Sequence, residues 1–334
     1  MKISNFIKFQ LKKWAPLFVV LAIYCFVFGV IFNSLLFVRG RSFIPSSALF
    51  PTMIIPSFVI PFFVFKEQFN KNMADTVNAF PSNKYQLNRI KILIGLIFIA
   101  SLSFFLHICC ILNSPSGYSL NYFLGFLFST LSLCVLYLLN CTLVSLGNTF
   151  VNSCLYVSSG CVLLFGFIPT LFVIFNWEAD IGLISTFGGV VGTYFILVQV
   201  EAGSLMMATG YIVLFIFVYL IQMGVGALAF FTKQPSGEYY GVPGARNKYH
   251  KAILYSAIGL SHVFIGAFLG RLSVSLSSLA SQLNLTIYIV AFIYSYILIV
   301  IFDKKFKISK KDWIILGSIE LGGLLFRIIL SLIY

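Results

Sequence analysis

The sequence contains few charged residues, and acidic ones are the scarcest. Only 9% of its 334 residues are charged, with 9 Asp and Glu against 22 Lys and Arg. A typical soluble domain is about 25% charged, whereas this chain is 60% hydrophobic and has a mean hydropathy of +1.01. So little charge cannot cover a water-exposed surface. This excludes a soluble nucleic-acid binder, a disordered chain and a secreted disulfide scaffold.

The motifs of the common catalytic sites are also missing. No Gly-Lys dipeptide occurs, so the chain lacks the P-loop that cradles nucleotide phosphates. It has no paired carboxylates, no His-Glu-x-x-His and no Gly-x-Ser-x-Gly. The seven cysteines lie in or beside apolar stretches, without the Cys-x-x-Cys spacing of zinc sites. We predict that the chain is not an enzyme by itself and holds no metal or cofactor of its own.

Long apolar stretches dominate what is present. About 20 apolar residues cross a bilayer as a helix, and backbone polar groups within lipid must be satisfied inside the helix. The sequence therefore predicts an all-α, polytopic transmembrane helix bundle of about nine spans. These lie near 17–38, 48–65, 92–112, 121–146, 154–175, 204–231, 252–270, 284–302 and 314–333.

The distribution of basic residues indicates the orientation. Eighteen of the 22 Lys and Arg fall in four segments, within 2–13, 66–91, 233–251 and 304–311. By the positive-inside rule all four are cytoplasmic, as is the N-terminus, provided that the apolar stretch 181–200 does not cross. That stretch contains four glycines, which weaken a continuous helix. We predict that it is re-entrant, with a tenth ordinary span as the alternative.

Residues 1–14 precede the first span and are amphipathic. Ile3, Phe6, Ile7, Leu11 and Trp14 share one helical face, and lysines occupy the other. The pattern predicts a helix lying in the inner membrane interface. It is either a membrane anchor or an arm that also contacts a cytoplasmic partner.

The segment 66–91 has the pattern of an elbow outside the membrane. Phe69, Met73, Val77 and Phe80 fall on one helical face, which needs a groove or the bilayer surface to cover it. Pro81 ends this helix, and Asn83 is placed to cap a second one that continues into the membrane. We predict a helix–proline–helix elbow that projects into the cytoplasm.

Three stretches resemble one known family. Asp75–Lys84, followed by Arg89 and Lys91, resembles the first cytoplasmic loop of type-2 ABC exporter permeases. The stretch Lys233–Glu238, with Gly241–Pro243 after it, is similar to a loop of the Ytr-type permeases of Gram-positive bacteria. Asp303–Lys307 is similar to the basic loop before their last spans.

The resemblance implies an architecture and a function. Residues 15–231 would form a six-span permease core, 232–251 a cytoplasmic loop and 252–334 three additional spans. The elbow would be a coupling helix seated in a separate ATPase subunit, which carries ATP and Mg. A second permease chain, identical or related, would complete a transporter in the bacterial cytoplasmic membrane. Its cargo would be an amphipathic peptide, an antibiotic or a lipid-like molecule.

The resemblance also assigns candidate residues. Those expected to couple to the ATPase are Phe69, Met73, Asp75, Thr76, Val77, Phe80, Pro81, Lys84 and Arg89. A second ATPase contact would involve Lys233, Glu238 and Arg246.

Charged residues inside the spans form a candidate polar site. Glu320 and Arg327 lie seven residues apart and so share a face of the last helix, and Glu201 lies at the edge of another span. A charge deep in lipid costs at least about 2.5–3.5 kcal/mol. We therefore expect Glu320 and Arg327 to pair with a neighbouring span rather than to contact substrate.

Both the second span and the function of the chain have an alternative interpretation. The prolines Pro51, Pro56 and Pro61 of the second span indicate either kinked packing or a flexible gate above the elbow. The alternative functions are a stand-alone secondary carrier or lipid scramblase, and a non-transporting sensor or immunity protein. The few intramembrane charges count against an ion-coupled carrier. In every case the expected surroundings are membrane lipids, not nucleic acid.

Overall fold

The computed structural model describes residues 3–32, 45–70, 83–112, 120–175, 189–193, 196–197, 209–232, 250–275, 279–303 and 305–333. Within these ranges every regular element is a helix, which confirms the all-α prediction. Seven helices are long and apolar enough to cross a membrane. The chain is therefore a multi-pass membrane protein.

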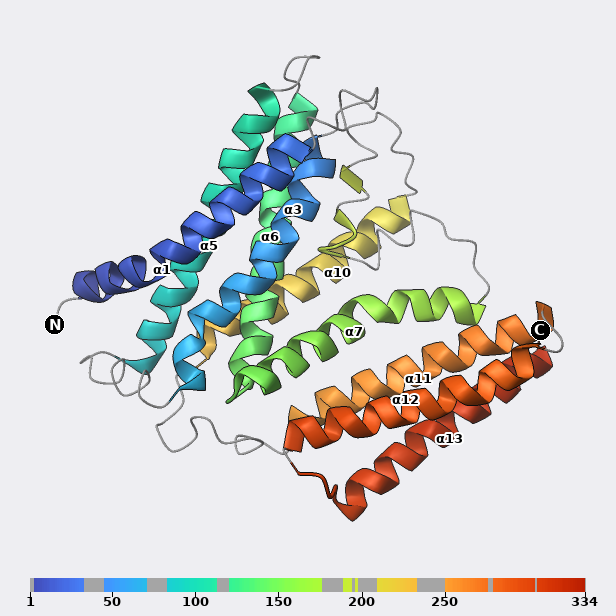
Figure 1. Ribbon diagram of the computed structural model, residues 1–334. Coiled ribbons are helices and arrows are strands. Elements are labelled where there is room, and N and C mark those ends of the chain that lie inside the picture. Colours follow the sequence, from blue (N-terminus) through green and yellow to red (C-terminus); the bar gives the residue numbers. More distant parts are fainter. Residues whose placement is uncertain are drawn as a thin grey trace. The chain divides into compact units, whose positions relative to one another are not determined.

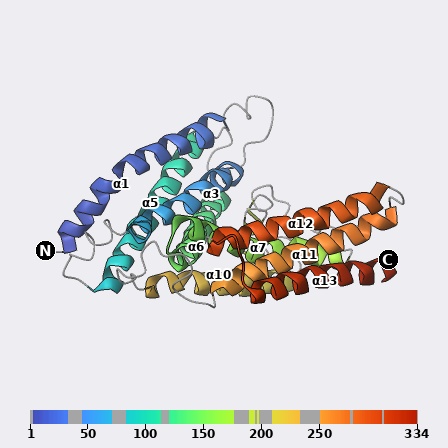
Figure 2. The same ribbon diagram turned by 60° about the horizontal axis from the view of Figure 1, so that its bottom comes forward.

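The chain divides into two compact units, Met1–Ser145 with Ile181–Tyr240, and Leu146–Asp180 with Gly241–Tyr334. The helices of the first unit are α1 (Ile3–Phe26), η1 (Val27–Phe32), α3 (Pro45–Val64), η2 (Lys66–Phe69), α5 (Lys84–Leu112), α6 (Leu120–Leu146), α10 (Thr209–Ala227) and η3 (Leu228–Phe231). Those of the second unit are α7 (Phe150–Phe175), α11 (His250–Ser275), α12 (Leu279–Asp303) and α13 (Lys310–Ile333). Figures 1 and 2 both show α11, α12 and α13 side by side.

The unit boundary differs from the predicted domain boundary. We predicted that the span 154–175 belongs to the six-span core, but its helix α7 packs in the second unit. Leu155 and Tyr156 of α7 share one apolar cluster with Leu254 and Ile258 of α11. Apolar contact with α11 thus groups α7 with the C-terminal helices.

The apolar surface of single helices agrees with a lipid environment. Val213, Phe217 and Leu220 of α10 are 63%, 59% and 58% exposed. In water such a face would be very unfavourable, at about 25 cal/mol per Å² of apolar surface. In a bilayer it is solvated by acyl chains, so only the opposite face has to pack against protein.

The N-terminal amphipathic segment is part of a longer helix. Residues 3–26 form the continuous helix α1, which contains Pro16. Phe6 packs against Leu87 of α5, and Trp14 is also buried. Leu11, predicted to share their face, is 45% exposed. The buried face of this segment is therefore rotated from the predicted one and contacts protein.

The prolines of the second span lie inside the continuous helix α3. Pro61 has no N–H, so the carbonyl of Ser57 loses its normal helical donor. Asn140 of α6 donates its side-chain amide to that carbonyl at 3.2 Å. An unpaired carbonyl would be costly within lipid. At Pro61 the contact with α6 favours kinked packing over a flexible gate.

A close helix crossing joins α11 to α13 in the second unit. A Cβ atom on Gly266 would lie 2.6 Å from the carbonyl oxygen of Gly323, so only glycine permits this approach. At its start α13 is capped reciprocally. The carboxylate of Asp312 accepts a hydrogen bond from the backbone N–H of Ser309 at 3.2 Å. Oγ of Ser309 accepts one from the backbone N–H of Asp312 at 3.3 Å.

The described part of the stretch 181–200 is buried in the first unit. Gly189 has φ of +50°, a left-handed conformation that favours glycine. Gln222 of α10 accepts the backbone N–H of Val190 at 2.7 Å, and Ser132 of α6 donates to Thr193 at 3.0 Å. Whether the whole stretch is re-entrant stays a prediction, because residues 176–188 and 198–208 lie outside the described ranges.

Candidate functional site

The structure describes the two ends of the predicted elbow. Phe69 lies in η2, and Lys84 and Arg89 lie at the start of α5. The other predicted coupling residues lie outside the described residues: Met73, Asp75, Thr76, Val77, Phe80 and Pro81. The same holds for Lys233, Glu238 and Arg246 of the predicted second contact, and for Glu201.

The first half of the elbow requires a correction. We predicted one helical face running from Phe69 to Phe80, but the helix at Phe69 is a single 3-10 turn. It ends at Asn70, whose φ of −137° and ψ of 119° are extended and whose N–H bonds back to the carbonyl of Glu67. An extended residue breaks helical periodicity. Phe69 is therefore not on the same continuous helix as Met73.

The second half begins as predicted. The side chain of Asn83 accepts the backbone N–H of Tyr85 at 3.0 Å, which is the geometry of an N-cap. The helix α5 then runs without a break from Lys84 through Lys91 to Leu112. The predicted cap and the continuation into the apolar span are both confirmed.

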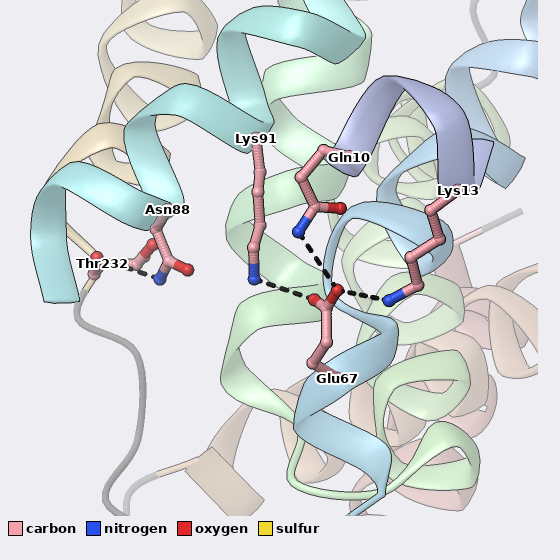
Figure 3. Close-up of polar contacts among 6 residues, drawn as sticks. All are labelled: Gln10, Lys13, Glu67, Asn88, Lys91 and Thr232. Carbon is pink, nitrogen blue, oxygen red and sulfur yellow. Dashed lines mark hydrogen bonds and ion pairs between the residues drawn. The ribbon is translucent and has the colours of Figure 1, made fainter. Parts of the chain in front are cut away.

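A buried ion-pair centre lies where the elbow joins the apolar helices. The carboxylate of Glu67 in η2 accepts a hydrogen bond from Nζ of Lys91 in α5 at 2.8 Å and another from Nζ of Lys13 in α1 at 2.7 Å. Gln10 of α1 contacts the same carboxylate at 3.5 Å. Figure 3 shows these side chains converging on Glu67 from two helices. We call these four residues the Glu67 centre.

The Glu67–Lys91 pair of the Glu67 centre is enclosed by protein, whereas Lys13 is 24% exposed. Glu67 is 0% and Lys91 is 2% exposed at the side chain. Burial alone would raise the pKa of the Glu67 carboxyl, but the positive charges of Lys91 and Lys13 outweigh it and hold that pKa below its ordinary value. Glu67 is therefore ionised at neutral pH and attaches η2 to both α1 and α5.

The start of α5 also contacts the end of α10. Asn88 donates to the carbonyl of Thr232 at 3.3 Å, as Figure 3 shows, and Arg89 donates to that of Phe230 at 2.9 Å. The Arg89 guanidinium also lies 5.8 Å from the ring centre of Phe231. Carbonyls at a helix end have no helical donors, so these two side chains cap the end of η3. The first two turns of α5 thus connect the elbow to η3, which follows α10.

The intramembrane charges have partners on neighbouring helices. Glu320 of α13 lies 2.8 Å from Nε2 of His262 in α11. The guanidinium of Arg327 lies 6.0 Å from the ring centre of Tyr288 in α12. Both contacts are of the kind expected from structural pairing with another span. They lie in the second unit, whereas the Glu67 centre is in the first.

A second ion-pair centre joins three helices of the second unit. Lys251 at the start of α11 lies 2.5 Å from Asp303 at the end of α12 and 3.0 Å from Asp312 at the start of α13. Tyr255 donates to Asp312 as well. We call these residues the Lys251 centre. The described ranges contain four acidic residues, and each lies beside a basic side chain: Glu67, Asp303, Asp312 and Glu320.

Sequence reasoning missed both centres and did not identify His262 as the partner of Glu320. Glu67 had one usable signal, since it is the single acid that directly follows the apolar stretch 48–65, among flanking lysines. Nothing in the local pattern marks Lys13 or Lys91 as its partners, because they are 54 and 24 residues away in the sequence. Among the described residues, no group of three His, Cys, Asp or Glu is placed to hold a metal ion.

Comparisons with protein families, curated proteins and solved structures give no match to this chain.

Proposed function

We propose that this protein is the membrane permease subunit of an ATP-driven ABC exporter of the type-2, Ytr-like class. It would move an amphipathic peptide, an antibiotic or a lipid-like substrate out of a bacterial cell. Separate ATPase subunits would supply ATP and Mg, and a second permease chain would complete the pore. This chain contributes the spans and the elbow, and it hydrolyses nothing.

The observation that carries the proposal is the Glu67 centre. The predicted elbow lies between Asn70 and Asn83 in the sequence, and Glu67 and Lys91 lie on either side of it. Their ion pair ties η2 to α5, and Lys13 adds α1. A displacement of the elbow by an ATPase would therefore move three helices together. Separating the buried pair would leave an uncompensated charge, so these three helices are held together at the base of the predicted elbow.

Helix direction supports a nine-span topology with a cytoplasmic N-terminus. Asn88 and Arg89 bring the end of η3 to the start of α5. Since α6 follows α5 as the next span, it ends on the side where α5 begins. If α7 crosses once, α10 can end on that side only if 176–208 makes no net crossing. This agrees with a re-entrant 181–200 and with all four basic segments on the cytoplasmic side.

Copurification tests the proposal most directly. Gentle extraction of the tagged protein from its native membrane should retain ATPase subunits. Asp75→Lys should lower the amount retained at least tenfold, without lowering the melting temperature of the permease. Phe306→Asp is the control, because Phe306 is 89% exposed in another basic loop of the proposed cytoplasmic side.

The side on which the elbow lies is a second, independent test. Thr76→Cys should react with a membrane-impermeant maleimide only after cells are permeabilised. Labelling in intact cells would place the elbow outside and overturn the proposal. So would purification of the wild-type chain from native membranes without any ATPase, in a form that still exports or scrambles substrate alone.

A further inference from the structure

A cavity of about 370 Å³ lies in the second unit between α7, α11 and α12. Ala257 and His262 of α11 line it and are buried, so α11 forms its floor. Val290 and Tyr294 of α12 also line it but are 59% and 62% exposed. Ser158 contributes from α7 and is exposed as well. The cavity therefore opens sideways between α7 and α12, at the depth of the apolar helix faces.

Three serines of the cavity are arranged as hydrogen-bond acceptors, and the hydroxyl groups of Ser159 and Tyr294 also line it. Ser158, Ser261 and Ser295 each donate to a backbone carbonyl of their own helix, at 3.0, 2.9 and 2.8 Å. A carbonyl oxygen cannot donate in return, so the single hydroxyl proton of each serine is already used. Only lone pairs of these oxygens remain for a bound molecule.

His262 adds no donor to the cavity. Its Nδ1 lies 2.8 Å from the carbonyl of Ile258 and must carry a proton to bond there. Its Nε2 lies 2.8 Å from a carboxylate oxygen of Glu320 in α13, which does not line the cavity. Both ring nitrogens therefore face groups of the protein.

This lining excludes charged ligands. No Asp, Glu, Lys or Arg lines the cavity, so a cation or an anion would find no counter-charge there. An unpaired ion in an apolar environment is very unfavourable. A neutral molecule with a hydrogen-bond donor and an apolar body fits both the lone pairs and the apolar walls.

We propose that this cavity binds a small lipophilic molecule carrying a hydroxyl or N–H donor, of the alkylphenol class, which enters from the bilayer. An adjoining cavity of about 390 Å³ shares Val162, Ser261 and Ile265 with it and gives room for a longer apolar tail. The proposal does not depend on the transporter function, since binding can be measured without ATPase subunits or transport.

The test uses the full-length protein in lipid nanodiscs and a diazirine-bearing thymol as photolabel. Mass spectrometry should locate the label on the facing parts of α7, α11 and α12. Unlabelled thymol should compete for this site at least tenfold better than para-cymene, which has the same carbon skeleton without the hydroxyl. Equal competition by the two would overturn the proposal and identify an apolar groove filled by acyl chains.

Variants separate the hydroxyl acceptors from the space. Ser261→Ala and Ser295→Ala keep the cavity but remove one acceptor each, so each should weaken thymol binding about three- to tenfold and leave para-cymene unchanged. Ser261→Phe should fill the cavity and abolish labelling there. Ser318→Ala is the matched control, because Ser318 also donates to its own helix, at 2.8 Å, but lies away from the cavity on α13.

Each result decides the question. Unchanged thymol affinity in both alanine variants contradicts the acceptor argument, even if Ser261→Phe fails to fold. Label spread evenly over exposed helix faces contradicts a defined site. A localised label that is lost in Ser261→Phe, with a wild-type melting temperature, supports the proposal.

Discussion

The two units of this protein contain ion-pair centres of opposite composition. In the first unit one acid, Glu67, is held by two lysines. In the second one base, Lys251, is shared by two aspartates. The Glu67–Lys91 pair is at most 2% exposed, whereas Lys251 and Asp303 are 18% and 24% exposed. Both centres join three helices, and the burial of their central pairs differs, although Lys13 is as exposed as Asp303, at 24%.

The difference in burial has an energetic meaning. Removing one partner of a buried pair leaves an uncompensated charge away from water, whereas an exposed charge is simply hydrated. The Glu67 centre should thus resist rearrangement as a unit. The Lys251 centre keeps partial contact with water, so a change of its geometry should cost less than in the Glu67 centre. This contrast suits a linkage that transmits motion in the first unit and a local helix tie in the second.

The largest expected effect comes from Glu67→Gln. It leaves the ammonium group of Lys91 buried beside a neutral amide, which should lower the free energy of unfolding by about 3–5 kcal/mol. Adding Lys91→Met should recover a substantial part, because the unpaired charge is removed. Denaturant titration in detergent micelles measures both. A loss below about 1 kcal/mol in the single variant would end the comparison between the centres.

A smaller effect is expected from Lys251→Met. Asp303, which is 24% exposed, is partly hydrated when its partner is lost, and the mostly buried Asp312 keeps its bonds to Tyr255 and Ser309. The free energy of unfolding should fall by about 1–2 kcal/mol, less than in Glu67→Gln. Lys305→Met is the control, because Lys305 is exposed in the connection between α12 and α13. This variant should leave the free energy of unfolding unchanged. If Lys251→Met destabilises as strongly as Glu67→Gln, burial does not distinguish the two centres.

The smallest effect concerns acid pH. The pKa of Glu67 is lower in the folded protein than the value of about 4.3 expected for an unfolded chain. Between these two values the unfolded state binds more protons, so acid favours unfolding. The stabilisation is complete above about pH 5 and is lost as the pH falls through the folded-state value. The melting temperature of the wild type should therefore decrease more steeply below pH 5 than that of Glu67→Gln. Equal slopes would show that Glu67 is not held ionised by the lysines.

The positions of the helices were largely predictable. The predicted spans 92–112, 121–146 and 284–302 lie within α5, α6 and α12, because an apolar run long enough to cross a bilayer leaves the backbone no alternative to a helix. The cap at Asn83 was predictable for a similar reason, since a side chain two residues away satisfies the N–H of Tyr85. Such signals are local and survive without knowledge of the rest of the fold.

The candidate site was only partly predictable. Glu67 was passed over, and Phe69 was placed on a helical face that ends at Asn70. Periodicity assigns a face to every residue of a helix but does not detect the single extended residue that interrupts it. Likewise, the apolar face predicted for α1 included Phe6 and Leu11. The buried face instead contains Phe6, Gln10 and Trp14, because α5 and Glu67 lie on that side.

The sequence by itself determined that this protein belongs in a lipid bilayer, where its apolar helices lie along the chain and how few acids it has. Hydrophobic length and charge count act on each segment separately, so they can be read from one chain. The tertiary structure alone decided that Glu67 meets Lys13 and Lys91, that Glu320 meets His262 and that α7 packs with α11. A scarce acid surrounded by 22 bases has many permissible partners, and only helix packing brings particular ones within hydrogen-bonding distance.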